Sequence, residues 1–145
     1  MEKIKVKLLR PDAQVPARAT ADSAGADLHA CMDGPVTVAP GETAFIGTGL
    51  AAAIPSGWAG LVFARSGLAC KKGLAPANKV GVIDSDYRGE IKVALHNHGT
   101  EPVTVTPGDR IAQLALVPVC MAEYEASETL EDTDRGAGGF GSTGK

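Results

Sequence analysis

The sequence is poor in aromatic residues and in cysteine, and it has no long apolar run. Aromatic residues make up 4% of the chain, so we expect a core of Val, Ile, Leu and Ala side chains. Its three cysteines, Cys31, Cys70 and Cys120, form no CxxC pair, which argues against a disulfide framework or a zinc knuckle. No apolar stretch approaches the ~18 residues of a membrane helix, and the N-terminus lacks a signal-peptide core. We therefore predict a cytoplasmic protein with no membrane partner.

Positive charge is also scarce. Lys and Arg number 14 against 17 Asp and Glu, which gives a formal net charge of −3, and the basic residues are scattered. Proteins that bind duplex nucleic acid through charge carry a basic patch or run. We therefore predict no nucleic-acid partner for this chain of 145 residues, whose length suits a single domain.

Glycine and proline, by contrast, are frequent, with 18 Gly and 9 Pro spread along the chain. Between them the apolar pattern repeats every second residue, as in Ile4, Val6 and Leu8 of a predicted first strand. Further strands are predicted at 42–48, 58–64, 78–84, 90–97, 103–106 and 109–120. This spacing predicts an all-β fold, a jelly roll or a similar antiparallel β-barrel.

One short helix is expected within this fold. Ser66 is the predicted N-cap, residues 68–71 form the helical turn, and Lys72-Gly73 is the stop. The Arg65-Ser66-Gly67 string also offers a guanidinium, a hydroxyl and free N–H groups, which suit an anion. In most proteins such a string is only a cap, so alone it does not identify a site.

The C-terminal part changes character at Glu123, where acidic residues lead into a glycine-rich end. We divide the chain into a β-barrel catalytic domain, 1–122, and a C-terminal arm, 123–145, that ends in a flexible Gly-rich tail. The end matches GxxxxGK but lacks the Ser/Thr and the helix of a P-loop, which excludes a P-loop ATPase. Its glycines, hydroxyls and Arg135 still suit a polyphosphate, and Phe140 is a candidate for stacking on a flat ligand.

Two further features have polar residues close together. Residues 81–91 are predicted to form a β-hairpin that carries Asp84, Asp86 and Tyr87 at its bend, although Asp at a bend most often only caps the turn. His96 and His98 share one face of a strand and could bind a metal. No third ligand is visible nearby, so we predict no metal site there and leave the role of the two histidines open.

Five motifs along the chain match one family in order. They lie at 24–28 (AGADL), 64–68 (ARSGL), 78–89, 108–113 (GDRIAQ) and 135–143. Together they make the sequence resemble the trimeric deoxyuridine triphosphatases (dUTPases) over nearly the whole chain after residue 20. Two departures are visible: Ala64 stands where the family commonly has Pro, and Trp58 is often a different residue. Both affect loop stiffness or packing rather than the reacting groups.

The resemblance implies an enzyme that hydrolyses dUTP to dUMP and pyrophosphate, which limits uracil incorporation into DNA and supplies dUMP for thymidylate synthesis. It makes Asp84 the catalytic residue, which orients and activates the attacking water. Tyr87 is then the residue that presses on the deoxyribose and leaves no room for a 2′-hydroxyl. Asn78, with the backbone of Gly81 and Lys92, is expected to read the uracil edge.

The resemblance also implies how the phosphates, the metal and the subunits are arranged. The residues expected at the phosphates and in the tail are Arg65, Ser66, Gly67, Gln113, Arg135, Phe140, Gly141, Ser142 and Thr143. Among them, Arg65 resembles a scaffold more than a direct ligand, and Phe140 is expected to lie over the uracil ring. Mg²⁺ is the implied cofactor, carried on the oxygens of the substrate and touched by Asp27 through water only. The implied assembly is a homotrimer with shared active sites, in which Asp84 and Phe140 of one site come from different subunits.

Three alternatives remain open. A deoxycytidine triphosphate deaminase shares this type of barrel, but it needs a different carboxylate arrangement at the pyrimidine, and the glycine-rich tail favours the hydrolase. A nucleotide-sensing or partner-docking module would capture its partner only with, or only without, a nonhydrolysable dUTP analogue. A purely structural β-barrel trimer would tolerate Asp84→Asn without losing any activity. The complete set of motifs favours the dUTPase interpretation.

Overall fold

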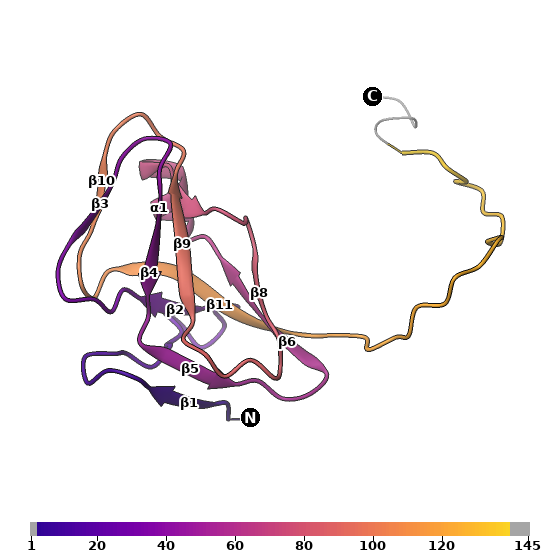
Figure 1. Ribbon diagram of the computed structural model, residues 1–145, viewed down its shortest axis with the longest axis horizontal. Coiled ribbons are helices and arrows are strands. Elements are labelled where there is room, and N and C mark those ends of the chain that lie inside the picture. The colour runs from indigo at the N-terminus through magenta and orange to yellow at the C-terminus, as the bar shows by residue number, and fades with distance from the viewer. Residues whose placement is uncertain (1–2, 140–145) are drawn as a thin grey trace.

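The computed structural model describes residues 3–139 of the chain. Short strands and a single helix follow one another along this range (Figure 1). In order, they are β1 (Lys5–Leu8), β2 (Ala26–His29), β3 (Val36–Val38), β4 (Thr43–Gly47), β5 (Leu50–Ala53), β6 (Trp58–Phe63), α1 (Ser66–Lys72), β7 (Leu74–Pro76), β8 (Gly81–Ile83), β9 (Lys92–Asn97), β10 (Val103–Val105) and β11 (Arg110–Pro118). This order confirms the predicted all-β fold with one short helix.

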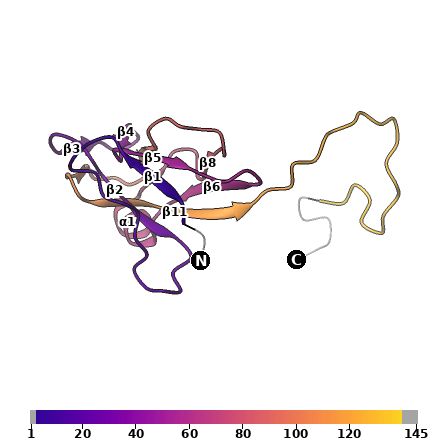
Figure 2. The same cartoon turned by 90° about the horizontal axis from the view of Figure 1, so that it is seen from below.

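Antiparallel pairing joins the strands into small sheets. The largest has the order β2-β11-β6-β8, a second has the order β4-β9-β7, and β1 pairs with β5 and β3 with β10. β11 lies between β2 and β6, so that Gln113 is opposite both Asp27 and Phe63. Figures 1 and 2 show the strands gathered into one compact body, from which the C-terminal arm extends away.

Alternating burial explains why these segments form strands. Along β9, Val93, Leu95 and Asn97 are buried, and the residues between them point outward. The buried apolar side chains are Ala, Val, Leu and Ile with one Cys and Pro76, and within residues 3–139 none is aromatic. The predicted aliphatic core is therefore confirmed. Asn97 is a buried polar residue, and its amide donates to the carbonyls of Val38 (2.9 Å) and Glu101 (2.8 Å).

The three cysteines are free thiols. Cys31 is buried, whereas Cys70 and Cys120 are exposed. Burial, with a smaller contribution from Asp12, raises the pKa of the Cys31 thiol. The interior cysteine therefore behaves as a small apolar core residue.

The predicted hairpin over residues 81–91 is wrong. In the described chain β8 pairs with β6, whereas β9 pairs with β4 and β7, so the two strands belong to different sheets. The physical reason lies at Ile91, whose N–H donates to the Leu50 carbonyl (2.8 Å) and whose carbonyl accepts the Thr48 hydroxyl (2.6 Å). These bonds draw the chain toward β5 before β9 begins. The two arms therefore diverge, and a pocket opens between them.

The N-cap of α1 is Arg65, not the predicted Ser66. Arg65 has extended backbone angles (φ −88°, ψ 129°), and Ser66 is already the first helical residue. At the other end the stop at Gly73 is confirmed, because Gly73 has φ 68° and its N–H donates to the Ala69 carbonyl at 3.0 Å. Over residues 3–139, no helix has the length and apolar character needed to cross a membrane.

The chain leaves the barrel at the end of β11. No helix or strand is assigned to residues 119–139, which include the described part of the C-terminal arm, and both views show this part extending away from the strands (Figures 1 and 2). Tyr124 and Leu130 on this arm are 100% and 89% exposed. The domain boundary at residue 122 and the flexibility of the tail stay predictions.

Candidate active site

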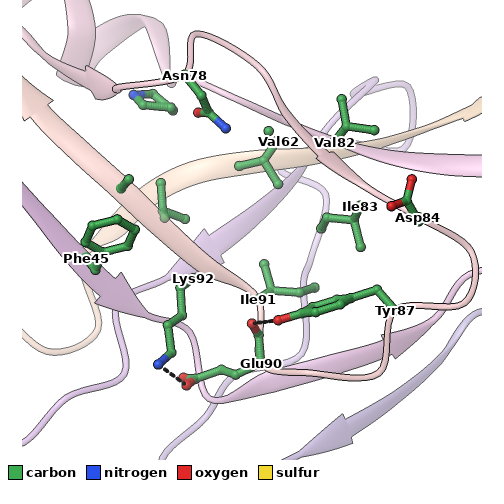
Figure 3. Close-up of a pocket in the computed structure, with 14 residues that line it drawn as sticks. Phe45, Val62, Asn78, Val82, Ile83, Asp84, Tyr87, Glu90, Ile91 and Lys92 are labelled. Carbon is green, nitrogen blue, oxygen red and sulfur yellow. Dashed lines mark hydrogen bonds and ion pairs between the residues drawn. The ribbon is translucent and has the colours of Figure 1, made fainter.

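A pocket of about 360 Å³ lies between the diverging strands β8 and β9 (Figure 3). We call it the β8–β9 pocket, and its volume falls in the range of small-molecule sites. Most of its wall is apolar, with a few polar groups among the aliphatic side chains. It is lined by Phe45, Val62, Pro76, Asn78, Gly81, Val82, Ile83, Asp84, Tyr87, Glu90, Ile91, Lys92, Val93 and Ala94.

Asn78 stands at one end of the β8–β9 pocket, on the turn between β7 and β8 (Figure 3). Lys79 holds this turn in the left-handed conformation (φ 65°), and the Val80 N–H donates to the Asn78 carbonyl at 2.7 Å. Gly81 lets β8 lie close to Val62 of β6 and to the side-chain amide of Asn78. A Cβ at position 81 would lie 3.3 Å from Cβ of Val62 and 3.5 Å from Nδ2 of Asn78. The side-chain amide can present an acceptor and two donors to a flat ligand.

Asp84 and Tyr87 lie at the other end of the β8–β9 pocket (Figure 3). The Tyr87 N–H donates to the Asp84 carbonyl at 3.2 Å, which closes a tight turn, and the phenol donates to the Glu90 carbonyl at 2.9 Å. Gly89 leaves space for the Tyr87 ring, because a Cβ at position 89 would lie 2.6 Å from Cζ of Tyr87. The residue remains 46% exposed, so the ring is accessible to a ligand.

Glu90 is a pocket residue that the sequence analysis missed. Its Oε1 accepts the Gly49 N–H at 2.9 Å, and its Oε2 lies 3.6 Å from Nζ of Lys92. The available signal was an opposite charge two residues before Lys92, which in extended chain places both side chains on one face. Glu90 therefore ties the loop before β9 to the chain segment between β4 and β5.

A second pocket, of about 330 Å³, lies beside the start of α1. We call it the α1 pocket. It is lined by Ala19, Ser23, Ala24, Gly25, Asp27, Arg65, Ser66, Gly67 and Gln113. Hydroxyl groups, an amide and a guanidinium surround this pocket, and such groups suit a phosphate.

Two arginines hold Asp27 in the α1 pocket. Nε of Arg65 lies 2.9 Å from Oδ1, and Nη1 of Arg110 lies 3.3 Å from Oδ2, while the Asp27 side chain is 16% exposed. Both carboxylate oxygens therefore already have cationic partners. Residues 3–139 contain no group of three or more His, Cys, Asp or Glu side chains placed to hold a metal ion. This donor set fits contact with a hydrated Mg²⁺ through water rather than direct coordination by Asp27.

Gln113 lines the α1 pocket from β11, the strand that pairs with β2. Its Nε2 donates to the Ala64 carbonyl at 2.9 Å, which fixes the amide beside the start of the helix. Gly25 makes this possible, because a Cβ at position 25 would lie 2.5 Å from the amide oxygen of Gln113. The glycine of the first motif therefore makes room for the glutamine of the fourth.

The structure divides the predicted site residues into two groups. Asn78, Gly81, Asp84, Tyr87 and Lys92 line the β8–β9 pocket, and Asp27, Arg65, Ser66, Gly67 and Gln113 line the α1 pocket. Among the described residues, none lines both. Arg135 lies on the arm, where its Nε donates to the Gly138 carbonyl at 3.0 Å. The predictions for Phe140, Gly141, Ser142 and Thr143 fall outside the described residues.

His96 on β9 and His98, just after the end of this strand, contact each other outside both pockets. The ring centroids of His96 and His98 are 4.4 Å apart. Nδ1 of His96 lies 2.8 Å from the Thr43 hydroxyl, and Nε2 of His98 lies 3.4 Å from Nζ of Lys79. Desolvation, with the charges of Lys79 and His96, lowers the pKa of His98. The geometry therefore favours a neutral His98 that accepts a hydrogen bond from Lys79.

Comparisons with known proteins agree with this arrangement of motifs. The family model described as dUTPase matches residues 11–144. A deoxyuridine 5′-triphosphate nucleotidohydrolase of Desulfitobacterium hafniense is 52% identical over 145 residues, covering 98% of this chain and 96% of that protein.

Solved structures show the same similarity. A mutant dUTPase of Staphylococcus bacteriophage 80alpha, determined with dUpNHpp, has a TM-score of 0.89 and 29% identity, and the match covers 100% of both chains. A mutant dUTPase from phage phi11 of S. aureus, described with a structural Mg(II) ion, has a TM-score of 0.81 and 27% identity over 90% of this chain and 100% of that chain. Because the family model covers nearly the whole chain and the bacterial relative is about half identical, the chain belongs to the dUTPase family.

Proposed function

We propose that this chain hydrolyses dUTP to dUMP and pyrophosphate. The observation that carries the proposal is the β8–β9 pocket, where Asn78, Asp84 and Tyr87 surround one cavity of about 360 Å³. Membership of the dUTPase family and the names of the relatives support the same reaction. The α1 pocket supplies a second set of groups, suited to phosphates.

The base is recognised by Asn78 and by the backbone of Gly81 and Lys92. β8 is the edge strand of its sheet in the described chain, so one of its edges is free to offer main-chain donors and acceptors to a pyrimidine. Cytosine presents its donors and acceptors in the reverse order, and each unpaired buried polar group costs about 1–3 kcal/mol. The close wall of β8 excludes the methyl group of thymine by contact.

The sugar and the reacting phosphate lie at the other end of the pocket. Tyr87 presses its ring against the deoxyribose and leaves no room for a 2′-hydroxyl. Asp84 accepts the sugar 3′-hydroxyl and a proton from water, which then attacks the α-phosphorus. A new P–O bond forms to water, the bond to the bridging oxygen breaks, and pyrophosphate leaves.

The phosphates are held by Ser66, Gly67 and Gln113 of the α1 pocket, and by tail residues. The tail residues in this role are Arg135, Ser142 and Thr143, with Gly141 supplying backbone and Phe140 covering the uracil ring. Arg65 acts as a scaffold, which its ion pair with Asp27 supports. Mg²⁺, when bound with the triphosphate, neutralises phosphate charge, and Asp27 is the residue we expect to contact it, through water.

The complete site is assembled between subunits of a homotrimer. Three observations support this: the two pockets share no lining residue within 3–139, the arm extends away from the strands, and apolar side chains on it, such as Tyr124 and Leu130, are exposed. In a trimer the α1 pocket of one subunit can face the β8–β9 pocket of the next, with the arm of a neighbour closing the site.

The proposed function is tested by measuring pyrophosphate release from dUTP, UTP, dCTP and dTTP. We expect kcat/KM for dUTP to exceed the others by about a hundredfold or more, because unpaired polar groups and steric exclusion penalise each competitor. Equal rates on UTP and dUTP would contradict the role of Tyr87. Ammonia release from dCTP, measured in parallel, would instead support the deaminase alternative.

A further inference from the structure

We propose that Glu90 is a positioning residue that sets how strongly the site rejects a ribonucleotide. It acts through Tyr87, and the proposal rests on the proposed dUTP site. Figure 3 shows Tyr87 reaching from the loop after Asp84 toward Glu90, while the Glu90 side chain extends toward Lys92.

The first link is between the Tyr87 phenol and the main chain of Glu90. The hydroxyl donates to the Glu90 carbonyl at 2.9 Å. Because Tyr87 is 46% exposed, core packing holds only part of the ring. The orientation of the ring against a sugar therefore depends on where the Glu90 carbonyl stands.

The second link is between the Glu90 carboxylate and the main chain of Gly49. Oε1 accepts the Gly49 N–H at 2.9 Å, and the Glu90 side chain is 26% exposed. This bond joins the loop before β9 to the segment between β4 and β5. It therefore fixes the position of residue 90 and, with it, the carbonyl that receives the phenol.

Gly47 makes room for this carboxylate, and Gly49 supplies its backbone donor. A Cβ at Gly47 would lie 2.6 Å from Oε1 of Glu90, and Gly49 has φ 65°, which strains any residue with a side chain. Lys92 supplies the charge partner, with Nζ 3.6 Å from Oε2. The carboxylate therefore lies beside a backbone donor, a cation and the space left by the missing side chain of Gly47.

Asp84 and Glu90 therefore have different roles in the β8–β9 pocket. Asp84 at one end acts on the water, whereas Glu90 holds the ring that excludes the 2′-hydroxyl. Loss of the anchor would let Tyr87 turn toward solvent and make room for ribose, while the reacting groups stay in place. Discrimination should therefore change more than turnover.

The test compares Glu90→Ala with Glu90→Gln in the full-length protein, using kcat and KM for dUTP and UTP. For Glu90→Ala we expect the ratio of kcat/KM for UTP to that for dUTP to rise about tenfold, mainly through KM, with kcat for dUTP within about twofold of wild type. Glu90→Gln keeps an oxygen for the Gly49 N–H, so its ratio should stay within about threefold of wild type. Glu42→Ala, a change at an exposed glutamate that lines neither pocket, is the matched control.

A double-mutant cycle shows whether Glu90 acts through Tyr87. Tyr87→Phe removes the hydrogen bond to the Glu90 carbonyl and should by itself raise the ratio of kcat/KM for UTP to that for dUTP. In the double variant, adding Glu90→Ala should change this ratio further by less than about twofold. Additive effects of the two substitutions would overturn the proposal. An unchanged ratio of kcat/KM for UTP to that for dUTP in Glu90→Ala would also overturn it. So would a Glu90→Gln variant whose ratio rises as much as that of Glu90→Ala. If Glu90→Ala does not fold, an unchanged ratio in Tyr87→Phe overturns the proposal and a raised one supports it.

The wild-type protein separates this inference from the function on which it rests. If wild type does not hydrolyse dUTP, the proposed function fails and the inference fails with it. If wild type prefers dUTP and Glu90→Ala keeps the wild-type preference, only the inference about Glu90 fails.

Discussion

Asp84 and Asp86 are two acidic residues of one short loop with different surroundings. Both are exposed, but only Asp84 lines the β8–β9 pocket. Asp84→Asn keeps the shape of the side chain and removes the base, so kcat for dUTP should fall by roughly 10² or more. The measurement is steady-state pyrophosphate release, with binding of a nonhydrolysable dUTP analogue to show that the site is still formed.

Asp86→Asn is the matched control for this prediction. It makes the same chemical change two residues away, outside the pocket, and turnover should stay within about threefold of wild type because no reacting group is lost. Near-native turnover in Asp84→Asn would show that another group activates the water. An equal loss in both variants would point to the fold of the loop rather than to its base.

At the scale of a single element, α1 depends on the glycine that ends it. Gly73 has φ 68°, and a Cβ there would lie 2.6 Å from the backbone N of Gly99. Gly73→Ala should therefore lower the free energy of unfolding by about 1–3 kcal/mol, through strain and backbone collision together. For a chain of this size the melting temperature should fall by several degrees, roughly 2–4 °C per kcal/mol.

Gly34→Ala is the control for the helix stop. Gly34 has no positive φ, and a Cβ at that position would meet nothing within 4 Å. Its melting temperature should stay close to wild type. If Gly73→Ala melts no lower than Gly34→Ala, the left-handed stop contributes little and the end of α1 rearranges freely.

The strands that the sequence predicts are those with visible alternation. β9 buries every second of its six residues, and that pattern is readable without a structure. β3 and β7 have three residues each, too few to show a period, and β5 reads Leu-Ala-Ala-Ala, with its first three residues buried. Short or fully buried strands are recognised only through their partners, which the sequence does not reveal.

The local sequence pattern does not show that β8 and β9 pair with other strands rather than with each other. Two strands around a tight turn predict a hairpin. Ile91, however, donates to the Leu50 carbonyl and accepts from the Thr48 hydroxyl, and these bonds direct the second strand to another sheet. Glu90 was missed for the same reason, because its partner Gly49 lies 41 residues away. Motif residues could be predicted, whereas the residues that position them depend on long-range contacts.

At the scale of the whole molecule, the residues of the proposed site lie in separate parts of one chain. The β8–β9 pocket holds Asp84, the α1 pocket holds Ser66 and Gln113, and the arm extends from the end of β11 (Figure 2). Residues 123–134 of the arm can span up to about 40 Å when extended, which is enough to reach a neighbouring subunit. Exposed apolar side chains on the arm, such as Tyr124, also favour contact with a partner.

Mixed trimers would test both the proposed homotrimer and which of its subunits supplies the tail. One inactive chain carries Asp84→Asn with its tail intact, and the other ends at Asp132 with Asp84 intact. Refolded together, they should regain part of the dUTP hydrolysis, because some sites then combine Asp84 of one chain with the tail of another. A tail that acted on its own barrel would leave every site without one of the two parts. Mixed trimers that are verified by native mass spectrometry but are inactive would therefore contradict shared sites. The two variants refolded separately give the background rate of dUTP hydrolysis.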